Sequence, residues 1–245
     1  MRNIKLLIEY EGTNYAGWQV QAGLPTIQGA LIEAASRLTH GQAQVAGASR
    51  TDAGVHALGQ VASLRTDSSI PSHKIMQGMN FFLPKDIVIK EAAEAPPDFD
   101  PRRGSKGKVY LYRIINRDHP SAIVRNFTWH VFASLDIAAM RQAAAHLIGE
   151  KDFSSFRAAG CEAIHPIREV TSVELFDRGE GLIEIEVRGT AFLRHMVRIM
   201  AGTLVAVGKG KIRPDELPDI TEAKQRAAAA MTAPAQGLCL VKVEY

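Results

Sequence analysis

The sequence predicts an α+β fold in which helices cover one face of a mostly antiparallel sheet. Strand-like segments occur in neighbouring pairs, and helical periodicity appears between them without the strict alternation of strand and helix that a parallel sheet requires. With 245 residues, 46% of them hydrophobic, the chain can bury one large core or two smaller ones. Both halves contain strands and helices of similar size, so a duplicated architecture is plausible, although no sequence repeat demonstrates it.

Residues 1–100 are expected to form the N-terminal half. The clearest helix covers residues 27–38, where apolar side chains recur every three to four residues after the start signals Pro25 and Thr26. The other elements expected in this half are strands over 4–10, around 60–64 and over 87–89, and a short helix over 73–82.

A boundary is expected where Pro96, Pro97 and Pro101 interrupt the pattern, so that residues 101–245 form the C-terminal half. One helix there is expected over 137–148, with Asp136 as its N-cap and Gly149 as its C-terminal stop. The other elements expected are strands over 109–115 and 129–132, a hairpin of 170–176 with 182–187, helices over 192–207 and 221–231, and a last strand over 238–243.

The composition excludes several classes of protein. Cys161 and Cys239 are the only cysteines, too few for a disulfide framework or a structural zinc site, and we expect both to be buried as small apolar side chains. The N-terminal apolar run is short and interrupted by charge, which predicts a cytoplasmic protein without a signal peptide or membrane span. No metal-binding spacing or nicotinamide fingerprint occurs, so we expect no metal and no cofactor. The net charge of +3 is only mildly basic, and the distribution of the charge is more informative.

Residues 47–57, GASRTDAGVHA, are the first candidate for chemistry. The glycines allow the backbone to approach a ligand closely, and Asp52 is the only acid in the loop. If the segment is extended, Arg50 points to the same side as Asp52 and can orient it, and an oriented carboxylate can serve as a nucleophile. The alternative interpretation is an ordinary surface turn with a solvated arginine.

Residues 101–117, PRRGSKGKVYLYRIINR, are basic and aromatic and contain no acid. Tyr110 and Tyr112 fall on one face of the expected strand, where aromatic rings can stack on bases while cations follow phosphates. The alternative is an amphipathic strand beside a solvated basic loop. The cations proposed here for RNA binding are Arg102, Arg103, Lys106 and Lys108.

Residues 192–198, FLRHMVR, open the helix expected over 192–207. Arg194 and Arg198 are four residues apart, which would place two like charges on one helix face and mildly favours an anion such as a phosphate between them. The alternative is a pair of solvated arginines.

Six segments in order resemble the tRNA pseudouridine synthase A family over essentially the whole chain. They are IEYEGTNYAGWQVQ, SRTDAGVHALGQV, KVYLYRI, KDFSSFR, FLRHMVRIMAGTL and APAQGLCLVKVEY. Two departures from the family pattern are Ser49, where many members have Gly, and Cys239, where many have Tyr.

The resemblance implies the pseudouridine synthase fold, with two α+β halves around a central sheet, a homodimer, and no metal or cofactor. It implies that Asp52 is the nucleophile, that Tyr110 contacts the target base, and that Arg50 and Arg198 frame the same pocket. The implied reaction forms pseudouridine from uridine at positions 38, 39 and 40, in the anticodon stem-loop of tRNA.

Two other functions remain open from the residues alone. A non-catalytic RNA-binding module accounts for the basic and aromatic strand but not for the loop with Arg50 and Asp52. A glycosidase-like hydrolase also acts at an anomeric carbon, but retaining enzymes of that class generally use two carboxylates and this loop offers one.

Overall fold

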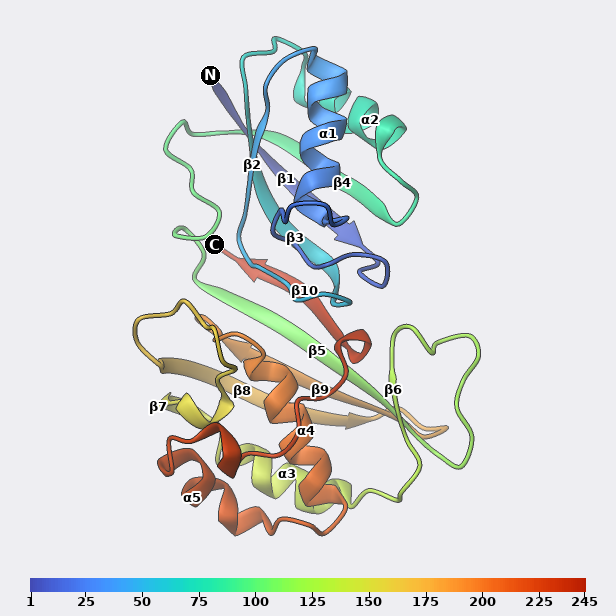
Figure 1. The fold of residues 1–245 in the computed structure, drawn as a ribbon, viewed down its shortest axis with the longest axis vertical. Helices are drawn as coiled ribbons and strands as arrows, with labels where there is room; N and C mark the ends of the chain where they lie inside the picture. Colours follow the sequence, from blue (N-terminus) through green and yellow to red (C-terminus); the bar gives the residue numbers. More distant parts are fainter. The chain divides into compact units, whose positions relative to one another are not determined.

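The chain folds as two compact units in the computed structural model, which describes residues 1–245. Unit 1 comprises Met1–Lys106 with Cys239–Tyr245, and unit 2 comprises Gly107–Leu238. Each unit combines helices with strands that pair mainly antiparallel (Figure 1). The predicted α+β class is therefore confirmed.

The compact units have other bounds than the halves 1–100 and 101–245: the first runs to Lys106 and also includes Cys239–Tyr245. The last strand, β10 (Leu238–Glu244), runs parallel to β3 (His56–Thr66), with Cys239 opposite His56 and Leu240 opposite Ala57. Residues that follow unit 2 in the sequence thus complete the sheet of unit 1. Local sequence patterns carry no information about pairing between such distant segments, which explains the difference.

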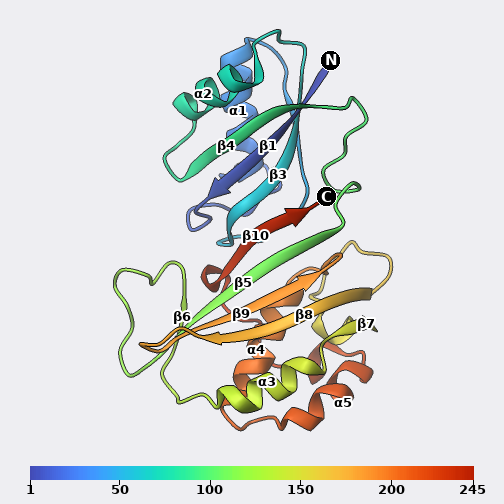
Figure 2. The same cartoon turned by 180° about the vertical axis from the view of Figure 1, so that it is seen from behind.

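The sheet of unit 1 has the strand order β4-β1-β3-β10, and β2 also pairs with β3. Helices α1 and α2 lie on one face of this sheet in Figure 1, and the view from behind shows no helix over the opposite face (Figure 2). The remaining elements of the unit are β1 (Arg2–Tyr10), α1 (Ile27–Thr39), β2 (Gln44–Gly47), α2 (Ser72–Phe82) and β4 (Ile87–Ala95).

The burial of α1 against the sheet of unit 1 follows from the two side-chain periodicities. Ile4, Leu6 and Ile8 are fully buried on one face of β1, and the helix buries Ile27 and Leu31. Each such side chain contributes about 1.5–3 kcal/mol through removal from water. Helix α1 begins where predicted, because the N-cap side chain of the preceding threonine accepts a hydrogen bond from the first turn.

The sheet of unit 2 has the strand order β5-β9-β8-β7, and β6 pairs in parallel with β5. The hairpin predicted from residues 170–187 is confirmed as the antiparallel pair β8 and β9. Helices α3 and α4 contact each other, α3 contacts β8 and α4 contacts β5. The elements of the unit are β5 (Gly107–Asn116), β6 (Trp129–Val131), α3 (Ile137–Ala145), β7 (Gly149–Asp152), β8 (Ile167–Asp177), β9 (Leu182–Gly189), α4 (Met196–Gly208) and α5 (Leu217–Glu222).

Helix α3 begins as predicted and ends earlier. The Asp136 side chain accepts a hydrogen bond of 2.9 Å from the backbone N–H of Ala139, which confirms the N-cap. The helix ends at Ala145, because the next three N–H groups donate to carbonyls three residues back and tighten the chain into a 3₁₀-like turn. Gly149, at φ +111°, begins β7 rather than stopping the helix.

Helix α4 starts four residues later than predicted. His195 adopts a left-handed conformation at φ +61°, and the N–H of Met196 donates to the carbonyl of Leu193 in a turn. Arg194 therefore lies outside the helix, and the predicted pairing of Arg194 and Arg198 on one helix face is wrong. The helix is also buried nearly all round instead of along a single stripe.

The helix predicted over 221–231 is wrong. The chain forms the short helix α5 over Leu217–Glu222, with Pro218 in its first turn, where a missing N–H costs nothing. Lys224 then takes a left-handed conformation at φ +52°, which ends the helix, and only the 3₁₀ turn Arg226–Ala228 follows.

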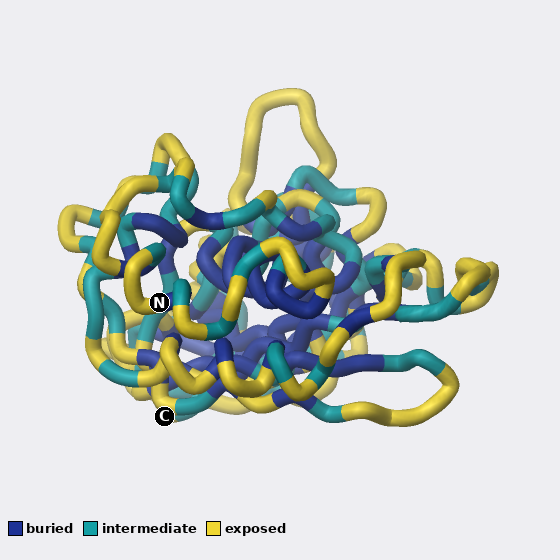
Figure 3. The backbone as a smooth tube through the Cα atoms, turned by 90° about the horizontal axis from the view of Figure 1, so that it is seen from below, coloured by how far each residue is buried: buried dark blue, intermediate teal, exposed yellow.

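Burial along the backbone separates packed elements from loops. In Figure 3 the loops that project from the molecule are mostly exposed, and the burial of single residues shows that the strands and helices hold most of the buried ones. None of the helices combines the length and the apolar character needed to cross a lipid bilayer.

Candidate functional site

Asp52 lies in the loop that joins β2 to β3 in unit 1, and its side chain is partly exposed. Gln60, which is fully buried in β3, holds the start of this loop through both polar groups of its side-chain amide. Its Oε1 accepts from the backbone N–H of Ser49 at 3.2 Å, and its Nε2 donates to the Ser49 carbonyl at 2.7 Å. The Gln60 side chain thus anchors the backbone of residue 49, where this chain has Ser and many family members have Gly. Because both bonds use backbone groups of that residue, Ser in place of Gly leaves the anchor intact.

Trp18 supports the same loop at Thr51 and at Gly47. Its backbone N–H donates to the carbonyl of Thr51, and its side chain is only 1% exposed. A Cβ added to Gly47 would lie 2.5 Å from two atoms of the indole ring, so only glycine fits there. The hydroxyl of Tyr10 also lies 2.7 Å from Oγ1 of Thr51, the residue directly before Asp52.

The end of the loop is fixed by a turn and by a histidine. The N–H of Val55 donates to the Asp52 carbonyl at 3.2 Å, and Gly54 between them has φ +77°. Nδ1 of His56 accepts from the backbone N–H of Gly12 at 3.0 Å, so the neutral ring carries its proton on Nε2. The loop is therefore held on both sides of Asp52, which restricts the directions that its carboxylate can take.

Sequence reasoning missed these supporting residues. Tyr10, Trp18 and Gln60 belong to segments recognised as family blocks, but no spacing rule identifies a buried amide or indole as support for a loop across the fold. Arg50 is exposed within the same loop as Asp52, as the sequence suggested.

Tyr110 lies on β5 in unit 2 and is 6% exposed. Its ring meets the ring of Phe192 edge to face, with 5.2 Å between the centroids. Tyr112, two residues on, is fully buried and donates a hydrogen bond of 2.8 Å to the carbonyl of Pro234. Both tyrosines proposed to stack on bases are thus buried, Tyr112 completely and Tyr110 to all but 6%.

Arg198 lies in the first turn of α4 and is half-buried. This agrees with the prediction from its position next to the apolar residues of the helix. Its Nε donates to the carbonyl of Ala233 at 2.8 Å. Arg194 is exposed, and its guanidinium lies 3.3 Å from the carbonyl of Ala159 in a neighbouring loop. The two arginines therefore have different surroundings.

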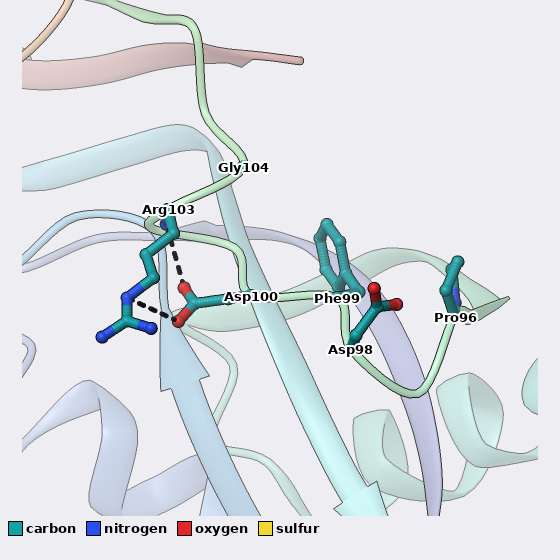
Figure 4. Close-up of a pocket in the computed structure, with 6 residues that line it drawn as sticks. All are labelled: Pro96, Asp98, Phe99, Asp100, Arg103 and Gly104. Carbon is teal, nitrogen blue, oxygen red and sulfur yellow. Dashed lines mark hydrogen bonds and ion pairs between the residues drawn. The ribbon is translucent and has the colours of Figure 1, made fainter.

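Three of the cations proposed for RNA binding, Arg102, Arg103 and Lys106, are exposed. Asp100 orders the turn of Arg102 and Arg103 by accepting their backbone N–H groups at 2.8 and 3.0 Å, and Asp100 and Arg103 both line the pocket drawn in Figure 4. These contacts, above all that of Arg103, lower the pKa of the Asp100 carboxyl, so it stays ionised and offsets part of the local positive charge. Lys108, in contrast, is only 7% exposed.

Comparison with known proteins agrees with the resemblance read from the motifs. Residues 6–102 and 143–245 match the profile of the tRNA pseudouridine synthase family. The chain is 49% identical over 245 residues to tRNA pseudouridine synthase A of Acetivibrio thermocellus and to that of Geobacter sulfurreducens, and each alignment covers all of both chains. One chain in a crystal structure of a Cbf5-Nop10-Gar1 complex is 11% identical in sequence, and its alignment, with a TM-score of 0.35, covers 96% of this chain and 57% of that chain.

The chain belongs to the tRNA pseudouridine synthase family. Over its whole length, the chain is similar in sequence to members named tRNA pseudouridine synthase A. This agrees with the family expected from the six segments.

Proposed function

We propose that this chain converts uridine to pseudouridine at positions 38, 39 and 40 in the anticodon stem-loop of tRNA, with Asp52 as the nucleophile. The observation that carries the proposal is the Asp52 loop, whose backbone is held at Ser49, Thr51 and Val55 and whose end is anchored by the His56 side chain, which accepts from the N–H of Gly12. Family membership supplies the reaction class and the substrate.

The reaction moves the glycosidic bond of the target from N1 of uracil to C5. The C–N bond breaks, the uracil turns, a C–C bond forms, and a proton leaves C5 while N1 gains one, so no external co-reactant is consumed. Whether the carboxylate attacks the ribose, attacks the base or removes a ribose proton, it must be oriented before the step begins. A carboxylate on a loop held from both sides meets this requirement with little reorganisation.

The target nucleotide must leave the stem before it can react, at a cost of a few kcal/mol. We assign Tyr110 to the target base, where an aromatic wall keeps detached uracil in place until it reattaches. Arg50 and Arg198 contact the same nucleotide, and Arg102, Arg103, Lys106 and Arg194 contact the tRNA backbone. Lys108 is a weaker member of this set because its side chain is buried.

We also propose that the enzyme is a cytoplasmic homodimer that needs neither metal nor cofactor. The support is the resemblance to the family and the location of tRNA in the cell. Sedimentation equilibrium at micromolar concentration tests the dimer, and a monomeric mass would contradict it.

The decisive experiment uses unmodified tRNA transcripts that carry tritium at C5 of uridine. Wild-type protein should release tritium to water, and Asp52→Asn should lower that rate at least about 10³-fold with tRNA affinity preserved, because the change is nearly isosteric. Transcripts with cytidine at position 38, 39 or 40 locate the targets. Release of free uracil would indicate a hydrolase, and tRNA binding without tritium release would indicate a binding module.

A further inference from the structure

The segment that precedes β10 lies along helix α4 and contacts it at several positions along its length. The backbone N–H of Ala230 donates to Oγ1 of Thr203 at 3.3 Å. A Cβ added to Gly202 would lie 1.9 Å from the carbonyl oxygen of Met231, so the segment touches the helix backbone there. These contacts fix the path of residues 230–237 in unit 2.

Arg198, to which the proposed function assigns a contact with the target nucleotide, is hydrogen-bonded to this segment at Ala233. Its Nε donates to the carbonyl of Ala233 at 2.8 Å, and the N–H of Ala233 donates back to the Arg198 carbonyl at 3.1 Å. The bond at Nε fixes the plane of the guanidinium group and hence the direction of its two terminal nitrogens. The direction of Arg198 therefore depends on where Ala233 lies.

Tyr112 holds the adjacent carbonyl from the sheet. Its hydroxyl donates to the Pro234 carbonyl at 2.8 Å, and its ring packs on Gly237, where a Cβ would lie 2.6 Å from Cζ. Trp129 contacts the ring edge to face, with centroids 6.3 Å apart. Adjacent carbonyls are thus held by Arg198 from the helix and by Tyr112 from the strand.

The Tyr112 hydroxyl is suited to this structural role. Burial raises the pKa of this phenol well above its usual range, and the nearby positive charge of Arg198 only partly opposes the effect. The phenol therefore remains neutral and keeps its proton for Pro234. Its side chain is fully buried, so we assign it no contact with substrate.

We propose that Tyr112 is a positioning residue for the isomerisation, which it promotes by fixing Ala233 and Pro234 so that Arg198 points toward the target nucleotide. The inference rests on the proposed function of Arg198. Removing the hydroxyl leaves the ring and its packing in place but frees the Pro234 carbonyl to shift, and Arg198 shifts with it.

The test compares Tyr112→Phe with Tyr245→Phe. Both changes remove a tyrosine hydroxyl that donates to a proline carbonyl at 2.8 Å, Pro234 in one case and Pro101 in the other. Tyr112→Phe should lower the single-turnover rate at saturating enzyme about tenfold, with tRNA Kd unchanged, because the direction of Arg198 affects the reacting state more than binding. Tyr245→Phe should react at the wild-type rate.

Two further measurements separate positioning from general destabilisation. In Tyr112→Phe, the backbone amides of Ala233 and of residues 235–237 should exchange hydrogen faster than in wild type, whereas Tyr245→Phe should leave them unchanged. The double variant Tyr112→Phe/Arg198→Lys should be no slower than Arg198→Lys alone, because both changes act through one side chain.

The proposal is overturned if Tyr112→Phe reacts at the wild-type rate, if exchange at Ala233 and residues 235–237 is unchanged, or if the two rate effects multiply in the double variant. Absence of pseudouridine formation by the wild-type protein is a different result. It refutes the proposed function, whereas the exchange measurement still reports whether the Tyr112 hydroxyl fixes this segment.

Discussion

The ring of Tyr110 meets the ring of Phe192 edge to face, at an interplanar angle of 87° and a centroid distance of 5.2 Å. Tyr110 is on strand β5, and Phe192 lies just before helix α4. Such pairs contribute about 0.5–1.5 kcal/mol beyond the area that they bury. The contact orients the one tyrosine of the basic strand that we assign to the target base.

Tyr110→Phe should therefore be milder than Tyr110→Leu if the ring is the functional part. The phenylalanine variant keeps both the aromatic face and the contact with Phe192, whereas leucine removes them. Single-turnover rates on unmodified tRNA measure the difference, and Phe192→Leu is the matched control because it removes the pair but leaves Tyr110. Equal losses for the phenylalanine and leucine variants at position 110 would instead assign the role to the hydroxyl.

Arg198→Lys should keep the fold and lower the single-turnover rate at least about tenfold, because lysine cannot reproduce the Nε bond to Ala233 together with a two-pronged contact. Arg194→Lys should mainly weaken tRNA binding, since Arg194 is exposed and outside the helix. Rates at saturating enzyme and tRNA Kd values separate the two effects. If the chemical step slows only in Arg194→Lys, the two roles are exchanged.

Binding of tRNA should weaken steeply with salt, because phosphate contacts release counterions with a log–log slope of roughly −0.7 to −0.9 per contact. Replacing Arg102, Arg103 and Lys106 together by alanine should make that slope shallower, by about one for each phosphate that the variant no longer neutralises. Filter binding over a range of salt concentrations measures the slope.

The matched control for that variant replaces three other exposed cations, Lys74, Lys85 and Lys211, by alanine. It changes the net charge equally but should preserve the slope. Equal slopes for the two triple variants would place the phosphate contacts elsewhere on the protein.

Glu184→Gln should destabilise the fold by about 1–3 kcal/mol at neutral pH, since Glu184 accepts hydrogen bonds of 2.9 Å from both Arg113 and Arg178. Burial by itself raises the pKa of the Glu184 carboxyl, but these arginines outweigh it and lower the pKa below its usual range. A carboxyl with a lowered pKa in the folded state contributes stability that is present above its unfolded pKa and is lost as the pH falls through the folded value.

The difference in unfolding free energy between wild type and Glu184→Gln should therefore shrink as the pH falls below the usual carboxyl range, to about pH 3. Denaturant melts across this range measure it. Glu186→Gln, on the same strand, is the control, because its partner Arg188 is about half exposed and such pairs contribute about 0–1 kcal/mol. If the difference in unfolding free energy between wild type and Glu184→Gln does not change with pH, the Glu184 carboxyl does not have the lowered pKa assigned to it.

Elements whose signals are local were predicted well. The start of α1 at Thr26, the N-cap of α3 at Asp136 and the hairpin of β8 and β9 were confirmed because side-chain capping and alternation act within a few residues. The start of α4 at Met196 differs from the predicted start, because His195 adopts a left-handed conformation, which helix propensity does not predict. The strand β2 was missed, since four residues show too little alternation to be recognised.

The sequence by itself determined the α+β class, the family, and Asp52 as the candidate nucleophile, because the RTDAGVHA block is specific and contiguous. Only the tertiary structure revealed how Gln60, Trp18 and His56 hold that block and how β10 completes the sheet of unit 1. These contacts join residues that are distant in the chain, and their hydrogen bonds exist only after the strands pair. Local periodicity reports the conformation of one segment, whereas the support of the Asp52 loop depends on which segments meet.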